Sequence, residues 1–417
     1  MARFEASLAR ASARCGLLAQ SDADIISQAC ARASFDSTAL ARDAREAGTL
    51  AIAFVKALTA QVAAVSPEAA RYVHFGATSQ DAIDSAVALC LRAAGHRVLE
   101  LAREVGDALA QLARQHRSTP MLARTLLQPA APVPFGWKAA MWLAPLSRSL
   151  PHLRAALAEA CVLQFGGASG TLSAFGERAD ALSLALAEEL GLERRVTWHS
   201  ARDGFARFGA EAALITGVVA KIARDITLLM QAEVGELAEP AALGRGGSSS
   251  MPHKRNPALS MLALEAAHRV PGLAANLLNQ LDPEHERGLG QWQSQWLTLR
   301  ELAAASASAL AAMREVLGGL HVNAAAMRSN LERSNGLVYS EALALRTSRA
   351  LAERLCAQAL REERHLLEVV RGDAEAARLL SGAQLTKLFD PERSYGGAEQ
   401  MIERVLSDWQ RARESAL

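Results

Sequence analysis

The stretch from Asp81 to Leu112 is DAIDSAVALCLRAAGHRVLELAREVGDALAQL, in which apolar residues recur every three or four positions. Phe208 to Leu229 shows the same spacing. This period is close to the 3.6 residues of a helical turn and gives each segment one apolar stripe. Such a stripe must be buried against a similar partner, so both segments are predicted to be long helices of a bundle. Thr78 and Asp81 match a capping box at the start of the first helix.

Composition also favours helix. Half of the 417 residues are hydrophobic, only 5% are aromatic, and Ala, Leu, Arg and Glu dominate over β-branched residues. The predicted fold class is all-α with three helical domains. These are an N-terminal domain over 1–94, a long central bundle over 95–342 and a small C-terminal domain over 343–417. The last part is more charged, and its helical segments are shorter.

Charge and cysteine content exclude several classes of protein. Lys and Arg number 45 against 44 Asp and Glu, and this balance provides no field suited to nucleic acid or an anionic membrane. The five cysteines are scattered and form no CxxC pair, as is typical of a reducing compartment. No signal-peptide run follows Met1, and the most apolar stretch, 210–220, is too short to span a bilayer, so a cytoplasmic location is expected.

No cofactor is predicted. The His, Cys and acidic residues show no spacing typical of metal ligands. No GxGxxG motif follows a strand, so a nucleotide cofactor is not expected either.

The segment from Gly244 to Pro257, GRGGSSSMPHKRNP, carries the residues best suited to chemistry. Its glycines and serines allow a mobile backbone, and Lys254 supplies positive charge. Hydroxyls and backbone N–H groups of such a loop can close over a carboxylate. On composition alone, a flexible linker with a basic surface patch is the commoner outcome. The GxxxxGK[ST] order of a P-loop is absent.

Three regions in order resemble the signatures of the fumarase/aspartase superfamily. GSSSMPHKRNP at 247–257 resembles GSSxMPxKxNP, HFGATSQD at 74–81 resembles HxGxTSxD, and TLLQPAAP at 125–132 resembles TxxQxAxP. The resemblance implies helical subunits whose central bundles join into a homotetramer, with each active site assembled from three subunits. It also implies addition or elimination next to a carboxylate of a small-molecule substrate, through an aci-carboxylate intermediate.

The resemblance also assigns roles to individual residues. Ser248 matches the general base, which acts as the acid in the reverse direction. Because an unperturbed serine hydroxyl is a very poor base, it requires a closed, dry loop with N–H donors nearby. The other matching positions bind substrate, and they are Thr78, Ser79, Gln128, Ser249, Lys254 and Asn256.

Two departures from the superfamily pattern point to one branch. Leu126 stands where amine lyases and fumarases usually have a histidine that handles the leaving group, and Gln295 stands where its glutamate partner is sought. The sequence instead resembles the bacterial 3-carboxy-cis,cis-muconate cycloisomerases of protocatechuate (β-ketoadipate) catabolism. In that lactonisation the nucleophile is a carboxylate that is already ionised, so the missing pair is tolerable. Pro129, where a polar residue is expected, and the short C-terminal part leave an altered substrate open.

A polycarboxylate substrate requires further cations near the loop. Arg287 is the first candidate, followed by Arg202, Arg255 and His285. His74 is a candidate for binding a carboxylate or assisting proton transfer. Two alternatives remain at this stage: a C–N lyase of the adenylosuccinate or nitrosuccinate type, and a non-catalytic, crystallin-like structural protein.

Overall fold

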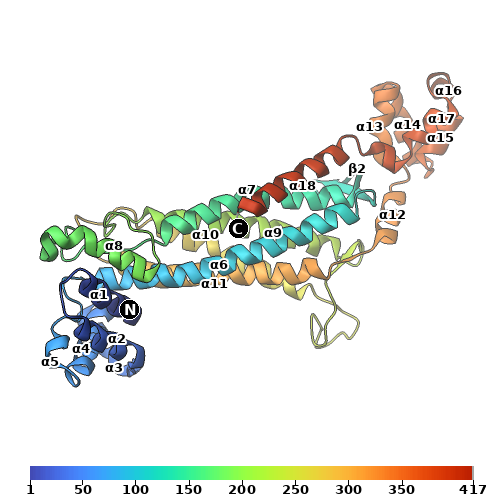
Figure 1. Cartoon of the computed structure of the whole chain (residues 1–417). Coiled ribbons are helices and arrows are strands. Elements are labelled where there is room, and N and C mark those ends of the chain that lie inside the picture. Colours follow the sequence, from blue (N-terminus) through green and yellow to red (C-terminus); the bar gives the residue numbers. More distant parts are fainter. Residues whose placement is uncertain (416–417) are drawn as a thin grey trace. The chain divides into compact units, whose positions relative to one another are not determined.

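The computed structural model describes residues 1–415, and its secondary structure is dominated by helices, as the composition predicted. The N-terminal part contains five helices, which Figure 1 shows gathered beside one another. Asp36, Thr49 and Ser66 cap three of them by accepting hydrogen bonds from N-terminal N–H groups. The helices are α1 (Ala2–Arg14), α2 (Gln20–Arg32), α3 (Ser37–Ala47), α4 (Leu50–Ala63) and α5 (Pro67–Ala70).

Five long helices form the middle of the chain. They are α6 (Ser79–Gln115), α7 (Phe135–Ala160), α9 (Asp203–Leu229), α10 (Ala258–Leu278) and α11 (Gln291–Gly318). The predicted apolar stripe of α9 is buried, and most of the stripe of α6 is buried as well. On α9 these residues are Phe208, Ala212, Ile215, Val219, Ile222 and Ile226, and on α6 they include Ile83, Leu91, Val98, Leu101, Val105 and Leu112. The periodicity of the sequence therefore located the two helices correctly.

The start of α6 differs in one detail from the predicted capping box. The Asp81 side chain accepts a hydrogen bond from the Thr78 N–H at 3.1 Å, which is half of that motif. The Thr78 hydroxyl instead accepts a hydrogen bond from Arg287 at 3.0 Å. The Thr78 side chain, which the sequence predicted to cap the helix, is thus bound by Arg287, a residue far along the chain.

The segment 117–136, which the sequence showed only as a break between helices, is an antiparallel β-hairpin. Strands β1 (Pro120–Thr125) and β2 (Gln128–Pro134) pair with Thr125 opposite Gln128. Several prolines exclude a helix here. Leu126 and Leu127 form the two-residue turn, both with positive φ, and their side chains are 97% and 73% exposed. A turn of this kind normally uses Asn and Gly, so the leucines gave no hairpin signal.

Most of the remaining helices and strands are short. The additional strands β3 (Leu237–Ala238) and β4 (His321–Val322) form a second antiparallel pair. A separate cluster of buried apolar side chains lies between Leu343 and Leu385. The other helices are η1 (Ser173–Arg178), α8 (Ala179–Leu190), α12 (Ala324–Glu332), η2 (Leu337–Tyr339), α13 (Ser340–Arg346), α14 (Arg349–Arg361), α15 (Leu366–Gly372), α16 (Ala374–Leu379), α17 (Gly382–Leu388), η3 (Pro391–Ser394) and α18 (Ala398–Ser415).

The chain divides into two compact units, each built from three separated stretches. The first contains Met1–Val98, His152–Ala213 and Arg269–Ala307, and the second contains Leu99–Pro151, Leu214–His268 and the chain from Ser308 onward. The unit boundaries fall inside the five long helices. The three domains expected at 1–94, 95–342 and 343–417 stay a prediction. Among the described residues, no helix is long and apolar enough to cross a membrane.

Candidate active site

The serine loop in the second unit is closed at its base by one backbone hydrogen bond. The Asn256 N–H donates to the Gly246 carbonyl at 2.7 Å. Gly246 has a φ of +64°, and a Cβ placed on it would lie 2.4 Å from the Asn256 carbonyl oxygen. Only glycine satisfies both conditions, because a side chain would be strained and would collide with backbone. The loop from Gly247 to Arg255 is therefore held at its two ends by Gly246 and Asn256.

Ser248 lies within this loop with its hydroxyl oxygen facing two backbone donors. Its Oγ accepts hydrogen bonds from the N–H groups of Ser250 at 3.3 Å and Met251 at 3.1 Å, and lies 3.4 Å from the Ser250 Oγ. N–H groups aimed at a hydroxyl oxygen favour its deprotonated form. The local fold of the loop thus places two N–H donors at the Ser248 oxygen.

The other predicted loop residues lie on the same segment. Ser249 and Lys254 are exposed, and Asn256 is half-buried. The Lys254 N–H donates to the Met251 carbonyl at 3.0 Å, which folds the cationic end back toward Ser248. Asn256 precedes α10, but its side chain does not cap that helix. Glu239 does so instead, accepting from the N–H groups of Leu259 and Ser260 at 3.0 and 2.7 Å.

Gln128 stands at the first position of β2, and its side chain is exposed. It directly follows the turn of Leu126 and Leu127, so the hairpin presents Gln128 near its tip. The expected proton-handling histidine is absent from this tip, and an apolar side chain takes its place. Arg124 on the same hairpin is engaged elsewhere, in a two-pronged ion pair with the buried Glu236 at 3.0 and 2.6 Å.

In the first unit, Asp81 holds the predicted binding segment from His74 to Ser79. This carboxylate is fully buried and receives five hydrogen bonds, which tie the segment before α6 to a glycine-rich loop. The donors are the N–H groups of Thr78, Gly166 and Gly167 at 3.1, 2.9 and 2.8 Å, and the side chains of Gln164 and His199 at 3.1 and 2.8 Å. The sequence motif contained Asp81, but nothing in the sequence identified these partners.

His74 is paired with a carboxylate from the N-terminal helix. Its Nδ1 lies 2.7 Å from Glu5 Oε1, and its backbone N–H donates to Glu5 Oε2 at 3.0 Å. Burial alone lowers the pKa of the imidazole, but the hydrogen bond and charge of Glu5, together with Asp81, outweigh burial and raise the pKa above its ordinary value. No local pattern indicated this pair, because the two residues are 69 positions apart.

Arg287 reaches the same segment from a loop before α11. It donates to the Thr78 hydroxyl at 3.0 Å and to the Ala168 carbonyl at 2.8 Å. Within residues 1–415 no acidic side chain forms an ion pair with it, so its positive charge is not neutralised. Nearby in sequence, His285 is exposed and has a φ of +47°. The structure thus joins Thr78 and Arg287 directly.

Arg202, predicted to bind substrate, is engaged in the protein interior. It is 3% exposed, and its guanidinium forms a two-pronged ion pair with the fully buried Asp84 at 2.6 and 3.2 Å. It also donates twice to Gln295 Oε1, at 2.9 and 2.6 Å. A glutamate at position 295 would place a second negative charge beside a cation that Asp84 already balances. Arg202 is therefore held in the interior by partners within the chain, and its role as a substrate ligand stays a prediction.

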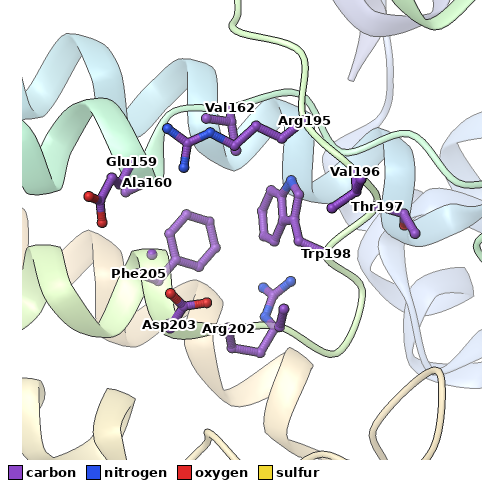
Figure 2. A pocket seen from close by; sticks show the side chains of 12 residues that line it. Glu159, Ala160, Val162, Arg195, Val196, Thr197, Trp198, Arg202, Asp203 and Phe205 are labelled. Atoms are coloured by element: carbon purple, nitrogen blue, oxygen red, sulfur yellow. The ribbon is translucent and has the colours of Figure 1, made fainter. Parts of the chain in front are cut away.

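Figure 2 shows Arg202 in the wall of a small hollow of about 190 Å³, among the aromatic rings of Trp198 and Phe205. The guanidinium carbon lies 4.7 Å from the Trp198 ring centre and 5.1 Å from that of Phe205. These contacts complete the fixation of the side chain. No group of three or more His, Cys, Asp or Glu side chains suited to hold a metal ion occurs among the described residues.

Comparisons with known proteins agree with the motifs. The lyase family matches residues 1–272. A 3-carboxy-cis,cis-muconate cycloisomerase of Bradyrhizobium diazoefficiens is 44% identical, with 99% of this chain and 93% of that protein covered. A nitrosuccinate lyase of Streptomyces davaonensis is 41% identical, with 99% and 90% covered. The crystal structure of 3-carboxy-cis,cis-muconate lactonizing enzyme from Pseudomonas putida superposes with a TM-score of 0.92 at 41% identity, with 99% and 94% covered.

The matched family region includes both the His74–Asp81 segment and the serine loop, and the relatives extend over nearly the whole chain. The superfamily assignment made from the three motifs is therefore confirmed, as is the helical fold class. The chain belongs to the lyase family, the fumarase/aspartase superfamily of enzymes, and within it resembles the cycloisomerase branch.

Proposed function

We propose that this enzyme interconverts 3-carboxy-cis,cis-muconate and 4-carboxymuconolactone. Support comes from the near full-length similarity to a cycloisomerase at 44% identity and to a lactonizing enzyme of known structure. The site adds a physical argument, since Leu126 and Gln295 provide no acid–base pair for a leaving group. A carboxylate nucleophile is already ionised and leaves as an ion in the reverse reaction, so no such pair is required.

The reaction balances as one ring closure and one proton uptake. One substrate carboxylate oxygen bonds to a carbon of the double bond, and the displaced electron pair moves to the carbon beside a second carboxylate. That carboxylate delocalises the charge as an aci-carboxylate. Ser248 then donates its hydroxyl proton to the carbon and is reprotonated from solvent. The trianionic substrate becomes a dianionic lactone, so one proton is consumed per turnover.

The observation that carries this mechanism is the contact of the Ser248 oxygen with two backbone N–H groups. When Ser248 donates its proton it becomes an alkoxide, and preorganised N–H donors stabilise such a charge most strongly in a water-excluded site. Lys254 is three residues beyond Met251 on the same loop and adds positive charge. In this mechanism Lys254 and Asn256 hold the carboxylate next to the protonated carbon.

The remaining predicted ligands would bind the other two carboxylates. Arg287 is suited to this role because its charge is not neutralised by an acid in the described chain. The resemblance places each active site at the meeting point of three subunits of a homotetramer, and we propose the same assembly here. The further substrate ligands in this proposal are His74, Thr78, Ser79, Gln128, Ser249 and His285.

An absorbance assay with 3-carboxy-cis,cis-muconate tests the reaction, since ring closure shortens the conjugated system. We expect turnover together with uptake of one proton per lactone, which a weakly buffered pH measurement detects. The second candidate is a nitrosuccinate lyase, favoured by the 41% identical relative. Turnover of nitrosuccinate without turnover of carboxymuconate would replace the proposed reaction by that one.

A further inference from the structure

The carboxylate of Glu5 is buried and directed at a single residue of the candidate site. Its side chain is only 1% exposed, on α1 in the first unit. A buried charge is unfavourable unless it is paired and hydrogen-bonded. Glu5 meets this requirement through His74, which is 16% exposed and stands at the start of the HFGATSQD segment.

Both carboxylate oxygens of Glu5 form hydrogen bonds with His74. One oxygen lies 2.7 Å from the ring Nδ1, and the other accepts from the backbone N–H at 3.0 Å. The two bonds fix the ring and the main chain of the same residue. A glutamine at position 5 could preserve only one of them, because it has a single acceptor oxygen.

The backbone conformation of His74 explains why the two hydrogen bonds to Glu5 are needed. Its φ is +60°, in the left-handed region that is unfavourable for a residue other than glycine. Strain of this kind persists where surrounding contacts enforce it, and it is concentrated at functional sites. The N–H to Glu5 hydrogen bond is such a contact, so Glu5 also holds the turn that leads into Thr78 and Ser79.

The pairing also determines which nitrogen of the ring is available. With Nδ1–H donated to Glu5, the Nε2 atom is the end of the ring left for another molecule, and it has no hydrogen-bond partner in the described part of the chain. The charged groups facing the ring are Glu5 and Asp81. Those facing Glu5 or its neighbour Cys30 are the Met1 amine and Arg10.

We propose that Glu5 is a positioning residue, which orients His74 through Nδ1 and keeps it cationic so that its Nε2–H binds a substrate carboxylate. This inference rests on the proposed function and deepens it by assigning His74 to binding rather than to proton transfer at carbon. Because the pKa of His74 is raised, its positive charge is present at low pH and is lost as the pH rises through that value.

The first test is a titration of the histidines by NMR in the ligand-free enzyme, with His74→Gln used to assign the resonance. We expect the pKa of His74 to lie above the ordinary histidine value of about 6.5 in the unaltered protein, and to fall in Glu5→Gln because the carboxylate that raises it is lost. A His74 pKa at or below about 6.5 in the unaltered protein would overturn the proposal, even if Glu5→Gln does not fold.

The second test separates positioning from a structural role. In the unaltered enzyme, KM should rise as the pH passes the His74 pKa, while kcat changes little. In Glu5→Gln this rise should occur at lower pH by the shift found in the titration, and Glu5→Asp should restore it in part. Glu189→Gln is the control, because it removes an ion pair of α1 with Arg10 at 2.7 Å without touching His74. An equal shift in both variants would contradict the assignment.

The two tests also distinguish failure of the Glu5 inference from failure of the proposed function. The titration requires no substrate, so it remains decisive if carboxymuconate is not turned over. An enzyme that converts carboxymuconate but keeps the same pH dependence of KM in Glu5→Gln would retain the proposed reaction and lose the role of Glu5.

Discussion

A serine hydroxyl exchanges a proton with carbon only if its environment makes the alkoxide accessible. At Ser248 that environment is local, because the two N–H donors belong to residues two and three positions further along the same loop. We propose that these two donors stabilise the alkoxide form of Ser248.

Ser248→Ala tests the assigned proton donor. We expect kcat to fall by roughly a thousandfold or more, the scale for losing a group that transfers a proton in the transition state. The oligomer and its circular dichroism spectrum should be unchanged, because the side chain is at a loop. Steady-state kinetics beside sedimentation gives both answers, and near-normal turnover would remove Ser248 from the mechanism.

Arg202→Ala distinguishes an interior residue from a substrate ligand. Removing the guanidinium leaves Asp84 buried without its cation, which costs about 3–5 kcal/mol in comparable sites. We therefore expect a large drop in the free energy of unfolding, measured with urea. A variant of native stability whose KM alone rises would restore Arg202 as a substrate ligand.

At the scale of elements, the serine loop and the hairpin show opposite uses of the left-handed backbone region. Gly246 occupies this region with the residue type suited to it, whereas Leu126 and Leu127 occupy it with bulky side chains. The first case is ordinary loop closure. The second retains backbone strain and exposes two apolar side chains at a hairpin tip, which indicates a role in contact with substrate or another subunit.

Gly246→Ala should open the serine loop at its base. The added Cβ would collide with the Asn256 carbonyl oxygen, so the closing hydrogen bond and the Ser248 geometry should be lost together. We expect at least a hundredfold loss of kcat/KM, the scale of effect for a misplaced catalytic group, with little change in Tm. Gly382→Ala is the matched control, since nothing lies within 4 Å of its added Cβ. Equal kinetics in both variants would contradict the role of the Gly246–Asn256 hydrogen bond.

The double variant Leu126→Asn, Leu127→Gly tests the hairpin tip. Asn and Gly adopt the left-handed turn readily, so the isolated hairpin should gain about 1 kcal/mol or more. If the leucines contact substrate or a neighbouring subunit, activity should fall while thermal stability rises or holds. Differential scanning calorimetry and the lactonisation assay measure the two effects, and unchanged activity would exclude such a contact. The single variant Leu126→His should not improve lactonisation.

At the scale of the whole molecule, the proposed sharing of active sites between subunits predicts how mixtures of variants behave. We expect that Ser248→Ala and Arg287→Ala, each impaired alone, recover activity when their subunits are dissociated and reassembled together. Sites that draw the two residues from different subunits would recover to about a quarter of the native activity for random mixing. Ser248→Ala mixed with Lys254→Ala is the control, because both changes lie on one loop and no intact loop can form. Absence of recovery in the first mixture would exclude sites shared in this way.

The sequence by itself determined the helices whose apolar stripes are long, the position of the serine loop and the superfamily. These features depend on local periodicity, on residue types and on motifs contained within a few adjacent positions. The same locality made Ser248 a candidate, because it lies in a stretch of eleven adjacent residues, 247–257, that resembles the superfamily signature. The hairpin at 120–134 was missed because its turn residues violate the local preference for that turn.

Only the tertiary structure shows which charged residues already have partners within the chain. The sequence offered both Arg287 and Arg202 as substrate ligands. Arg202 pairs with buried Asp84, whereas Arg287 contacts Thr78 and forms no ion pair with an acidic side chain within residues 1–415. Glu5 likewise becomes a candidate for a role at the site only because α1 places it against His74. The physical reason is that pairing and burial depend on residues far apart in the chain, and these set charge, orientation and pKa.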